Sequence, residues 1–146
     1  MSQTFFEPTQ EAGAALFRRN ITGEVVMLNL LRFRGVADYS ATPELAPDEP
    51  ISGRVAYQKY IDFTLPFLQK TGGDLIFLGE GGNFLIGPWD ERWDLMMLVR
   101  QTSLADFMAF AADEGYLASM GHRTAALEDS RLLPLIEFKG GDIMRG

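Results

Sequence analysis

The sequence predicts an α+β fold, with a four-stranded antiparallel sheet and both packing helices on one face of it. Apolar runs typical of strands and segments with helical spacing follow each other in the order β-α-β-β-α-β after a short leading helix. The chain has 146 residues, of which 47% are hydrophobic and 23% charged. This size and composition are those of one globular domain, so we expect a single domain over residues 1–146.

Composition also excludes several classes of protein. The chain has no cysteine, which rules out a disulfide-dense secreted scaffold and any thiolate nucleophile or thiolate metal site. Its net charge of -7 disfavours nucleic acids and membrane surfaces as partners, because both need a basic face. Arg18 and Arg19 follow the first apolar stretch, the reverse of a secretory signal, so we expect a cytoplasmic protein.

The first elements are a leading helix and a central strand. Residues 9–19 have the spacing of a short amphipathic helix that starts near Thr9. Residues 25–33 form an apolar run too short for a buried helix and rich in branched side chains, which predicts a central strand. Residues 34–52 collect prolines and small polar residues without periodicity. They predict a long loop that is either disordered or a functional lid or arm.

A packing helix and a second strand follow the loop. Apolar side chains recur at helical spacing over residues 53–70, and Pro66 is expected to kink the helix or end it early. The two glycines within residues 71–73 are expected to end this helix. Residues 74–87 predict a strand that glycines interrupt at 79–82, as a bulge or a tight reversal.

The remaining elements are a strand, a second helix and a final strand. Residues 93–100 predict the third strand, and the helix after it is expected to break at Gly115 and then resume. Residues 132–138 predict the last strand, in which Pro134 indicates an edge position or a bulge. The tail, residues 139–146, is expected to be mobile.

The central strand is apolar on both of its faces, with Met27 and Leu31 on one and Leu28 and Leu30 on the other. A sheet that is apolar on both faces must cover both, and two helices cover only one. We therefore expect the second face to pack against the same face of another copy, in a symmetric homodimer.

Several short motifs follow one another in the middle of the chain. They are residues 26–33, Tyr57 with Tyr60, Pro66, Gly72-Gly73, Trp93-Asp94 and residues 122–130. In order and spacing they resemble the uncharacterised family called domain of unknown function 1330. The resemblance implies a ferredoxin-like subunit, a dimer whose sheets enclose an α/β barrel, and a pocket between sheet and helices, with no established reaction. The leading helix and residues 34–52 depart from the family pattern.

Asn29 and His122 are the candidate catalytic residues. Asn29 is an amide in an otherwise apolar strand, so it either bonds a neighbouring segment or orients a ligand carbonyl in a pocket. His122 is the only histidine and can accept a proton, pair with an anion or serve as an axial ligand, although one histidine cannot build a conventional metal site. Its alternative is a structural or surface role, because a lone histidine lacks the orienting partner that catalysis needs.

Four further side chains are candidates for substrate binding. Arg123 and Arg32 match an acidic ligand through the guanidinium fork, and their alternative is ion pairing within the protein. Trp93 and Tyr60 offer flat walls for a planar substrate, and their alternative is the hydrophobic core. The glycine clusters lie outside any phosphate-binding pattern, and no serine occupies a nucleophile elbow.

These residues lead to three hypotheses about function. The first is a small-molecule enzyme, by fold-level analogy a cofactor-independent oxygenase or isomerase acting on a planar metabolite, with no metal and no cofactor. In it Asn29 and Arg123 hold the substrate's oxygens and His122 moves a proton. The second is a haem-binding protein with His122 as the axial ligand. The third is a dimeric ligand-binding or interaction module without catalysis.

Overall fold

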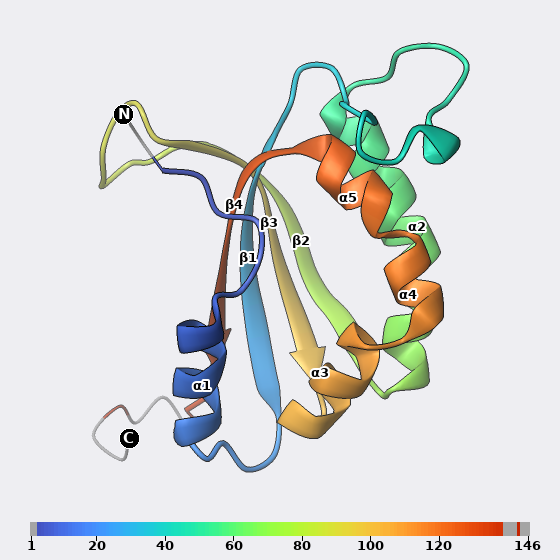
Figure 1. Ribbon diagram of the computed structural model, residues 1–146. Coiled ribbons are helices and arrows are strands. Elements are labelled where there is room, and N and C mark those ends of the chain that lie inside the picture. Colours follow the sequence, from blue (N-terminus) through green and yellow to red (C-terminus); the bar gives the residue numbers. More distant parts are fainter. Residues whose placement is uncertain (1–2, 139–142, 144–146) are drawn as a thin grey trace.

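The computed structural model describes residues 3–138 and residue 143, and its centre is a four-stranded sheet (Figure 1). The strands are β1 (Val25–Phe33), β2 (Asp74–Asn83), β3 (Arg92–Gln101) and β4 (Leu127–Leu135), in the order β2-β3-β1-β4. All neighbouring strands are antiparallel, and β4 is an edge strand, as Pro134 indicates. This is the ferredoxin-like βαββαβ topology, which confirms the predicted fold class.

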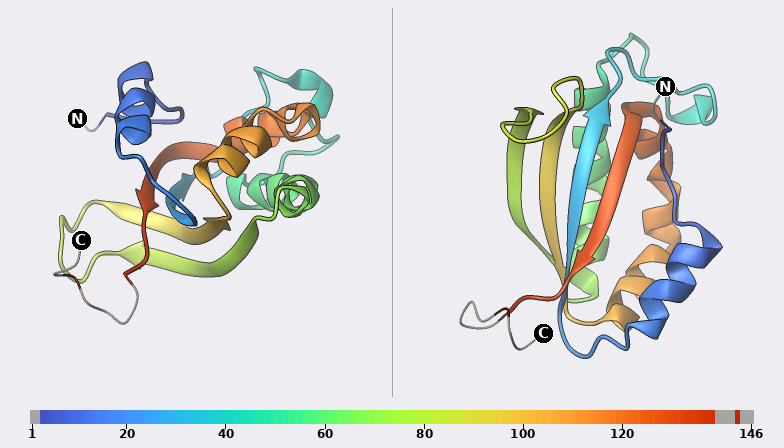
Figure 2. Two further views of the ribbon diagram at one scale, coloured as in Figure 1. Left: turned by 90° about the horizontal axis from the view of Figure 1, so that it is seen from below. Right: turned by 90° about the vertical axis from the view of Figure 1, so that its left-hand side faces the viewer.

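The helices of the two crossovers cover one face of the sheet (Figure 2). They are α2 (Gly53–Lys70) between β1 and β2, and α3 (Leu104–Ala111), α4 (Glu114–Ala118) and α5 (Met120–Ala126) between β3 and β4. The predicted leading helix is α1 (Gln10–Arg18), with Thr9 as its N-cap. It lies beside β4, where Arg19 donates a hydrogen bond of 3.2 Å to the Pro134 carbonyl. No helix in the described part of the chain is both long and apolar enough to cross a membrane.

The helices differ from prediction at two points. α2 continues through Pro66 to Lys70 instead of ending early. Pro66 lies on the exposed side of the helix, and its missing N–H removes a single backbone hydrogen bond, which the helix tolerates. Gly115 does not break the second helix. The break comes before α4, where the Asp113 side chain caps the first turn. Gly115 lies within α4, and its lack of a side chain leaves room for the ring of Phe67, with which a Cβ would collide.

Two strands differ from prediction as well. β2 continues through the glycines at 79–82, and its irregularity is a register shift between Leu75 and Phe77. β4 begins at Leu127, five residues before the predicted start, because Leu127 already pairs with Phe33 of β1. The predicted mobile tail lies outside the described residues apart from residue 143.

Residues 34–52 form an arm that packs against α5. The amides of Arg34 and Asp38 donate hydrogen bonds of 2.9 Å to the carbonyls of Ala126 and Ala125, the last residues of that helix. Tyr39 is buried, and a short 3-10 helix spans Pro43–Leu45. Of the two alternatives for this loop, the structure therefore favours a folded arm.

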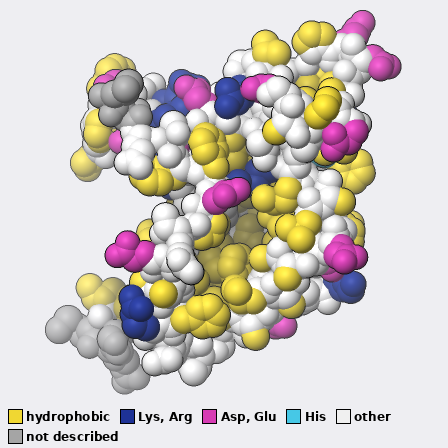
Figure 3. Space-filling model, viewed as in Figure 1, with side chains coloured by type: hydrophobic (Ala, Val, Ile, Leu, Met, Phe, Trp, Pro, Cys, Tyr) yellow, Lys and Arg dark blue, Asp and Glu magenta, His cyan; other side chains and the backbone are white. Residues whose placement is uncertain are grey.

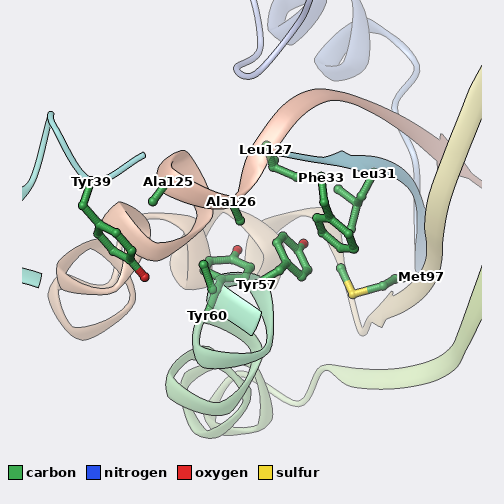
Figure 4. Close-up of a cluster of buried hydrophobic side chains, with 10 residues drawn as sticks. Leu31, Phe33, Tyr39, Tyr57, Tyr60, Met97, Ala125, Ala126 and Leu127 are labelled. Atoms are coloured by element: carbon green, nitrogen blue, oxygen red, sulfur yellow. The ribbon is translucent and has the colours of Figure 1, made fainter. Parts of the chain in front are cut away.

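The central hydrophobic cluster lies between β1, β3, α2 and α5 (Figure 4). Its large side chains include Leu31, Phe33 and Tyr57, whereas the residues at the contact between α2 and α5 are small. Ala56, Ala125 and Ala126 are fully buried, so α2 and α5 approach closely at this end of the helical layer (Figure 4).

The first prediction concerns the start of α2. A Cβ at Gly53 would lie 2.6 Å from the carbonyl oxygen of Ala126 and still closer to that of Arg34. Because backbone atoms cannot move aside, we expect Gly53→Ala to lower the free energy of unfolding by about 2–3 kcal/mol in chemical denaturation. Gly13→Ala is the control, since a Cβ there meets nothing within 4 Å and should stabilise α1 by about 0.5–1 kcal/mol. Equal effects of the two substitutions would contradict this packing.

Candidate functional site

A cavity of about 270 Å³ lies between the helix-facing side of the sheet and the helices. Figure 3 shows it as a hollow lined with hydrophobic side chains in the middle of the viewed face. The walls come from the strands and from α2, α3 and α4, and most are apolar: Met27, Leu75, Met97, Val99, Leu132, Ile61, Leu65, Leu68, Phe107, Phe110 and Leu117. A partly open, mostly apolar cavity of this kind is typical of small-molecule sites.

A small number of polar side chains face this cavity. Asn29 lies on the floor in β1, where its Nδ2 donates a hydrogen bond of 3.2 Å to the Met27 carbonyl. The hydroxyls of Tyr60 in α2 and Tyr116 in α4 form a hydrogen bond, with 2.9 Å between their oxygens. Arg123 of α5 also lines the cavity. Each of these groups keeps hydrogen-bonding capacity beyond the bond it already makes.

Burial raises the pKa of two tyrosines that line the cavity. Desolvation raises the pKa of Tyr60 well above its usual value, and the same cause raises the pKa of the fully buried Tyr57. The positive charge of Arg123 acts in the opposite direction on both pKa values, but it is outweighed. Both hydroxyls are therefore neutral at pH 7 and can donate or accept hydrogen bonds, and neither is a base.

The segment before α1 forms one wall of the cavity through Phe6, Glu7 and Pro8. Arg123 fixes it with a hydrogen bond of 2.9 Å from its guanidinium to the Phe6 carbonyl. The Phe5 amide donates to the Asp129 carboxylate at 2.9 Å. The sequence did not reveal this wall, because it joins residues separated by more than a hundred positions.

The Asp129 carboxylate that holds this segment is fully buried at the start of β4. Burial alone would raise its pKa, but hydrogen bonds from the Phe5 amide, the Arg131 side chain and the Ser130 amide outweigh that effect and lower it. Asp129 is therefore ionised at neutral pH, and its salt bridge to Arg131 measures 2.7 Å. Because the carboxylate is ionised and its hydrogen bonds are all made within the protein, we interpret Asp129 as a structural residue that holds the N-terminal segment on β4.

His122 does not line the cavity, contrary to the prediction. It lies on α5 and faces the arm, where the Tyr39 hydroxyl is 2.8 Å from Nδ1 and the Phe63 ring stacks on the imidazole. Burial lowers the pKa of His122, and the nearby positive charge of Lys59 lowers it further. The structure thus gives His122 the partners of a packed structural side chain.

Trp93 and Arg32 also lie outside the cavity. The Arg32 guanidinium stacks over the Trp93 ring at 4.5 Å and pairs with Asp129 at 3.4 Å. The Trp93 indole donates a hydrogen bond of 2.9 Å to the Glu91 carboxylate. The structure therefore brings together three of the six candidates, Asn29, Tyr60 and Arg123, and places the other three elsewhere.

The sequence did not single out several other polar residues of the cavity, among them Tyr116 and Gln101. Gln101 had a usable signal. It follows Met97 and Val99 at alternating positions, so its side chain falls on the same face of the sheet as theirs. Tyr116 had no such signal, because the division of the second crossover into three helices decides where it points.

Among solved structures, the chain is similar to RPA0582 from Rhodopseudomonas palustris, a protein of unknown function. The two are 36% identical over 94% of this chain and 99% of that chain, with a TM-score of 0.79. The chain belongs to the RPA0582 family. A structure of methylated RPA0582 matches with 35% identity over 95% of this chain and 98% of that chain, and its TM-score is 0.81.

The other comparisons do not add a function to the RPA0582 family. SnoaB, a cofactor-independent oxygenase from Streptomyces nogalater, is 13% identical over 82% of this chain and 99% of that chain, with a TM-score of 0.46. A similarity of that size carries no functional argument. No family model and no curated protein matches the chain, so the resemblance to domain of unknown function 1330 stays a prediction.

The second prediction uses His122 of this RPA0582-family protein. Because its pKa is lower in the folded than in the unfolded state, the unfolded chain binds the proton more tightly. We therefore expect the imidazole to contribute fully to stability above about pH 6.5 and to lose that contribution as the pH falls through the folded-state pKa. Denaturant unfolding between pH 8 and 5 should show this loss in the wild type.

His122→Asn is the control for this pH dependence. The difference in unfolding free energy between wild type and variant should shrink as the pH falls, because the variant has no imidazole to protonate. A constant difference over this range would contradict a lowered pKa.

Proposed function

We propose that this protein binds a planar, predominantly apolar small molecule in the cavity between sheet and helices. The observation that carries the proposal is the cavity itself, with about 270 Å³ of space and a mostly apolar lining. A dry apolar cavity of about 150 Å³ is enough to hold benzene. The space here therefore suits a ligand of about two fused rings.

The polar groups around the cavity indicate the ligand's functional groups. Three hydrogen-bonding side chains, Asn29, Tyr60 and Arg123, line the same mostly apolar cavity. Arg123 spends part of its donor capacity on the Phe6 carbonyl, and the rest suits a carbonyl, hydroxyl or carboxylate oxygen. A ring system that carries one or more oxygens meets these requirements.

In its catalytic form the proposal is a cofactor-independent oxygenase or isomerase, with Asn29 and Arg123 holding the substrate's oxygens. His122 lies away from the cavity, so it is unsuited to the proton transfer first assigned to it. Glu7 is the one carboxylate among the described lining residues, so it is the candidate general base for turnover. The haem hypothesis loses its support for the same reason, because its axial ligand was His122.

We also propose that the protein is a homodimer joined through the open face of the sheet. Val26, Leu28 and Leu30 alternate with the helix-facing residues of β1 and are only half-buried. Four of their six neighbours on the same face of the adjoining strands are apolar, namely Met96, Leu98, Leu133 and Leu135, and the other two are Arg100 and Arg131. Leu133 is 55% exposed, a large value for leucine on a sheet face. A second copy offers the same apolar face, and sheet-on-sheet packing would cover both.

The third prediction tests ligand binding. A thermal-shift screen should include quinols, hydroxylated aromatics, small carboxylates and haem. A ligand that binds only the folded state adds about 2.7 kcal/mol at a hundred times its dissociation constant, which raises the melting temperature measurably. Ala111→Trp places a large side chain at the cavity wall, so it should abolish the shift.

Ala112→Trp is the matched control, because the neighbouring Ala112 is exposed and lies outside the lining. It should keep the thermal shift of the wild type. A ligand whose shift survives Ala111→Trp binds elsewhere, and such a result would remove the cavity from the proposal.

The fourth prediction tests the dimer. Leu28→Lys places a charge on the open sheet face, where the partner's identical charge would approach it, and burying unpaired charges is costly. Light scattering after size-exclusion chromatography should report a dimer for the wild type and about half that mass for the variant. Leu85→Lys is the control, because Leu85 is fully exposed in the β2–β3 loop. A monomeric wild type would refute the dimer.

A further inference from the structure

Arg123 is the one basic residue among the described lining residues of the cavity. Its guanidinium donates two hydrogen bonds, from Nη1 to the Phe6 carbonyl at 2.9 Å and from Nη2 to the Ser130 hydroxyl at 3.5 Å. Both acceptors are neutral oxygens, so neither cancels the positive charge. Within the described part of the chain, Arg123 forms no salt bridge with a carboxylate. The described residues thus leave a positive charge on the cavity wall without a counter-charge.

The carboxylates that follow Arg123 in the sequence pair with other arginines. Glu128 pairs with Arg92 at 3.4 Å, and Asp129 pairs with Arg131 at 2.7 Å. A cation in the last turn of a helix can also offset the partial negative charge of the last carbonyls. In α5, however, these carbonyls accept hydrogen bonds from amides of the arm. Ion pairing within the protein, the alternative role of Arg123, is therefore not observed among the described residues.

Solvent reaches the guanidinium, which lies close to hydroxyls of the cavity. Its hydrogen bond to Phe6 is exposed, and Phe6 belongs to the cavity wall. Its charge opposes the rise in pKa that burial causes at Tyr57 and Tyr60, two further lining residues. Dark blue side-chain atoms are visible at the upper edge of the hollow in Figure 3, so a basic group borders this space. An oxygen of a ligand would meet the guanidinium beside neutral O–H donors.

Glu7 is the other charged member of the described lining. It is exposed to solvent and forms no salt bridge with Arg123, which is half-buried. Solvent and salt screen an exposed charge more than a half-buried one. The positive charge therefore has the stronger effect inside the cavity, and the cavity favours a negative ligand.

We propose that the ligand is an anion and that Arg123 is the residue that pairs with its charge. This inference rests on the proposed function and adds the ligand class: a planar ring system that carries an anionic oxygen, in the simplest case a carboxylate. The guanidinium donors that are not used on Phe6 and Ser130 remain for this oxygen. A charged group enters an apolar space only against a counter-charge, because an unpaired charge is costly there.

The experiment compares 2-naphthoate with its neutral analogue 2-naphthamide by isothermal titration calorimetry at pH 7. The wild type should bind naphthoate about tenfold more tightly, because hydrogen bonds between two charged groups are stronger than those to a neutral oxygen. Arg123→Gln removes the charge and keeps a polar side chain. It should bind naphthamide at least as tightly as naphthoate, since the carboxylate would then enter the cavity without a counter-charge.

Two further variants separate charge pairing from a structural role of Arg123. If Arg123 served only to hold the N-terminal wall, Arg123→Gln would weaken the binding of both compounds alike and leave their ratio unchanged. Arg123→Lys keeps the charge, so naphthoate should remain the tighter ligand. Arg34→Gln removes an equal charge from an exposed position outside the lining, and it should leave both affinities as in the wild type.

A measurement on the wild type alone does not depend on any substitution. Raising the NaCl concentration about tenfold should weaken the binding of naphthoate more than that of naphthamide, because salt screens the attraction between the carboxylate and the guanidinium. An equal effect of salt on the two compounds would contradict the pairing.

The outcomes distinguish this inference from the proposed function. Wild-type binding of naphthamide as tightly as naphthoate, or a preference for naphthoate that Arg123→Gln leaves unchanged, would overturn the role of Arg123 and leave the cavity proposal standing. Binding of neither compound by the wild type would count against the proposed function.

Discussion

The close contact of α2 with α5 is the constraint on which the rest of the structure depends. At Gly53 the start of α2 touches the carbonyl of Ala126, and the fully buried alanines of both helices allow them to meet with no large side chain between. Further along the layer, aromatic residues such as Tyr60, Tyr116 and Phe110 take over from alanines. These aromatic residues, unlike the alanines, line the cavity between the sheet and the helices.

Most of the polar groups that line the cavity are neutral, and Arg123 and Glu7 are its charged members among the described residues. Tyr57 and Tyr60 are phenols at neutral pH, burial raises the pKa of both further, and the two amides, Asn29 and Gln101, do not titrate. Neutral groups of this kind are suited to hydrogen bonding rather than to proton transfer. Charged groups are instead used to tie the chain together, as Asp129 does with the residues around it.

The sequence predicted the order of elements well and the site only in part. A continuous apolar run placed β1 at its observed bounds, and helical spacing with the end signals Thr9 and residues 71–73 located α1 and α2, because these signals are local. Asn29 was recognisable as a lone amide in an apolar strand. His122 was misleading, since the partners that make it structural, Tyr39 and Phe63, belong to distant segments. Gln101 was overlooked because a polar residue at the end of a strand resembles an ordinary boundary.

The attachment of the first residues to the last strand has a consequence for biosynthesis. The Ser130 hydroxyl donates to the Phe5 carbonyl, a contact that spans 125 residues. A ribosome delivers the first of these residues early and the second only when nearly all of the domain has been made. The N-terminal wall must therefore wait, undocked, until β4 is in place. Until β4 has been made, a nascent chain therefore lacks the N-terminal wall of the cavity.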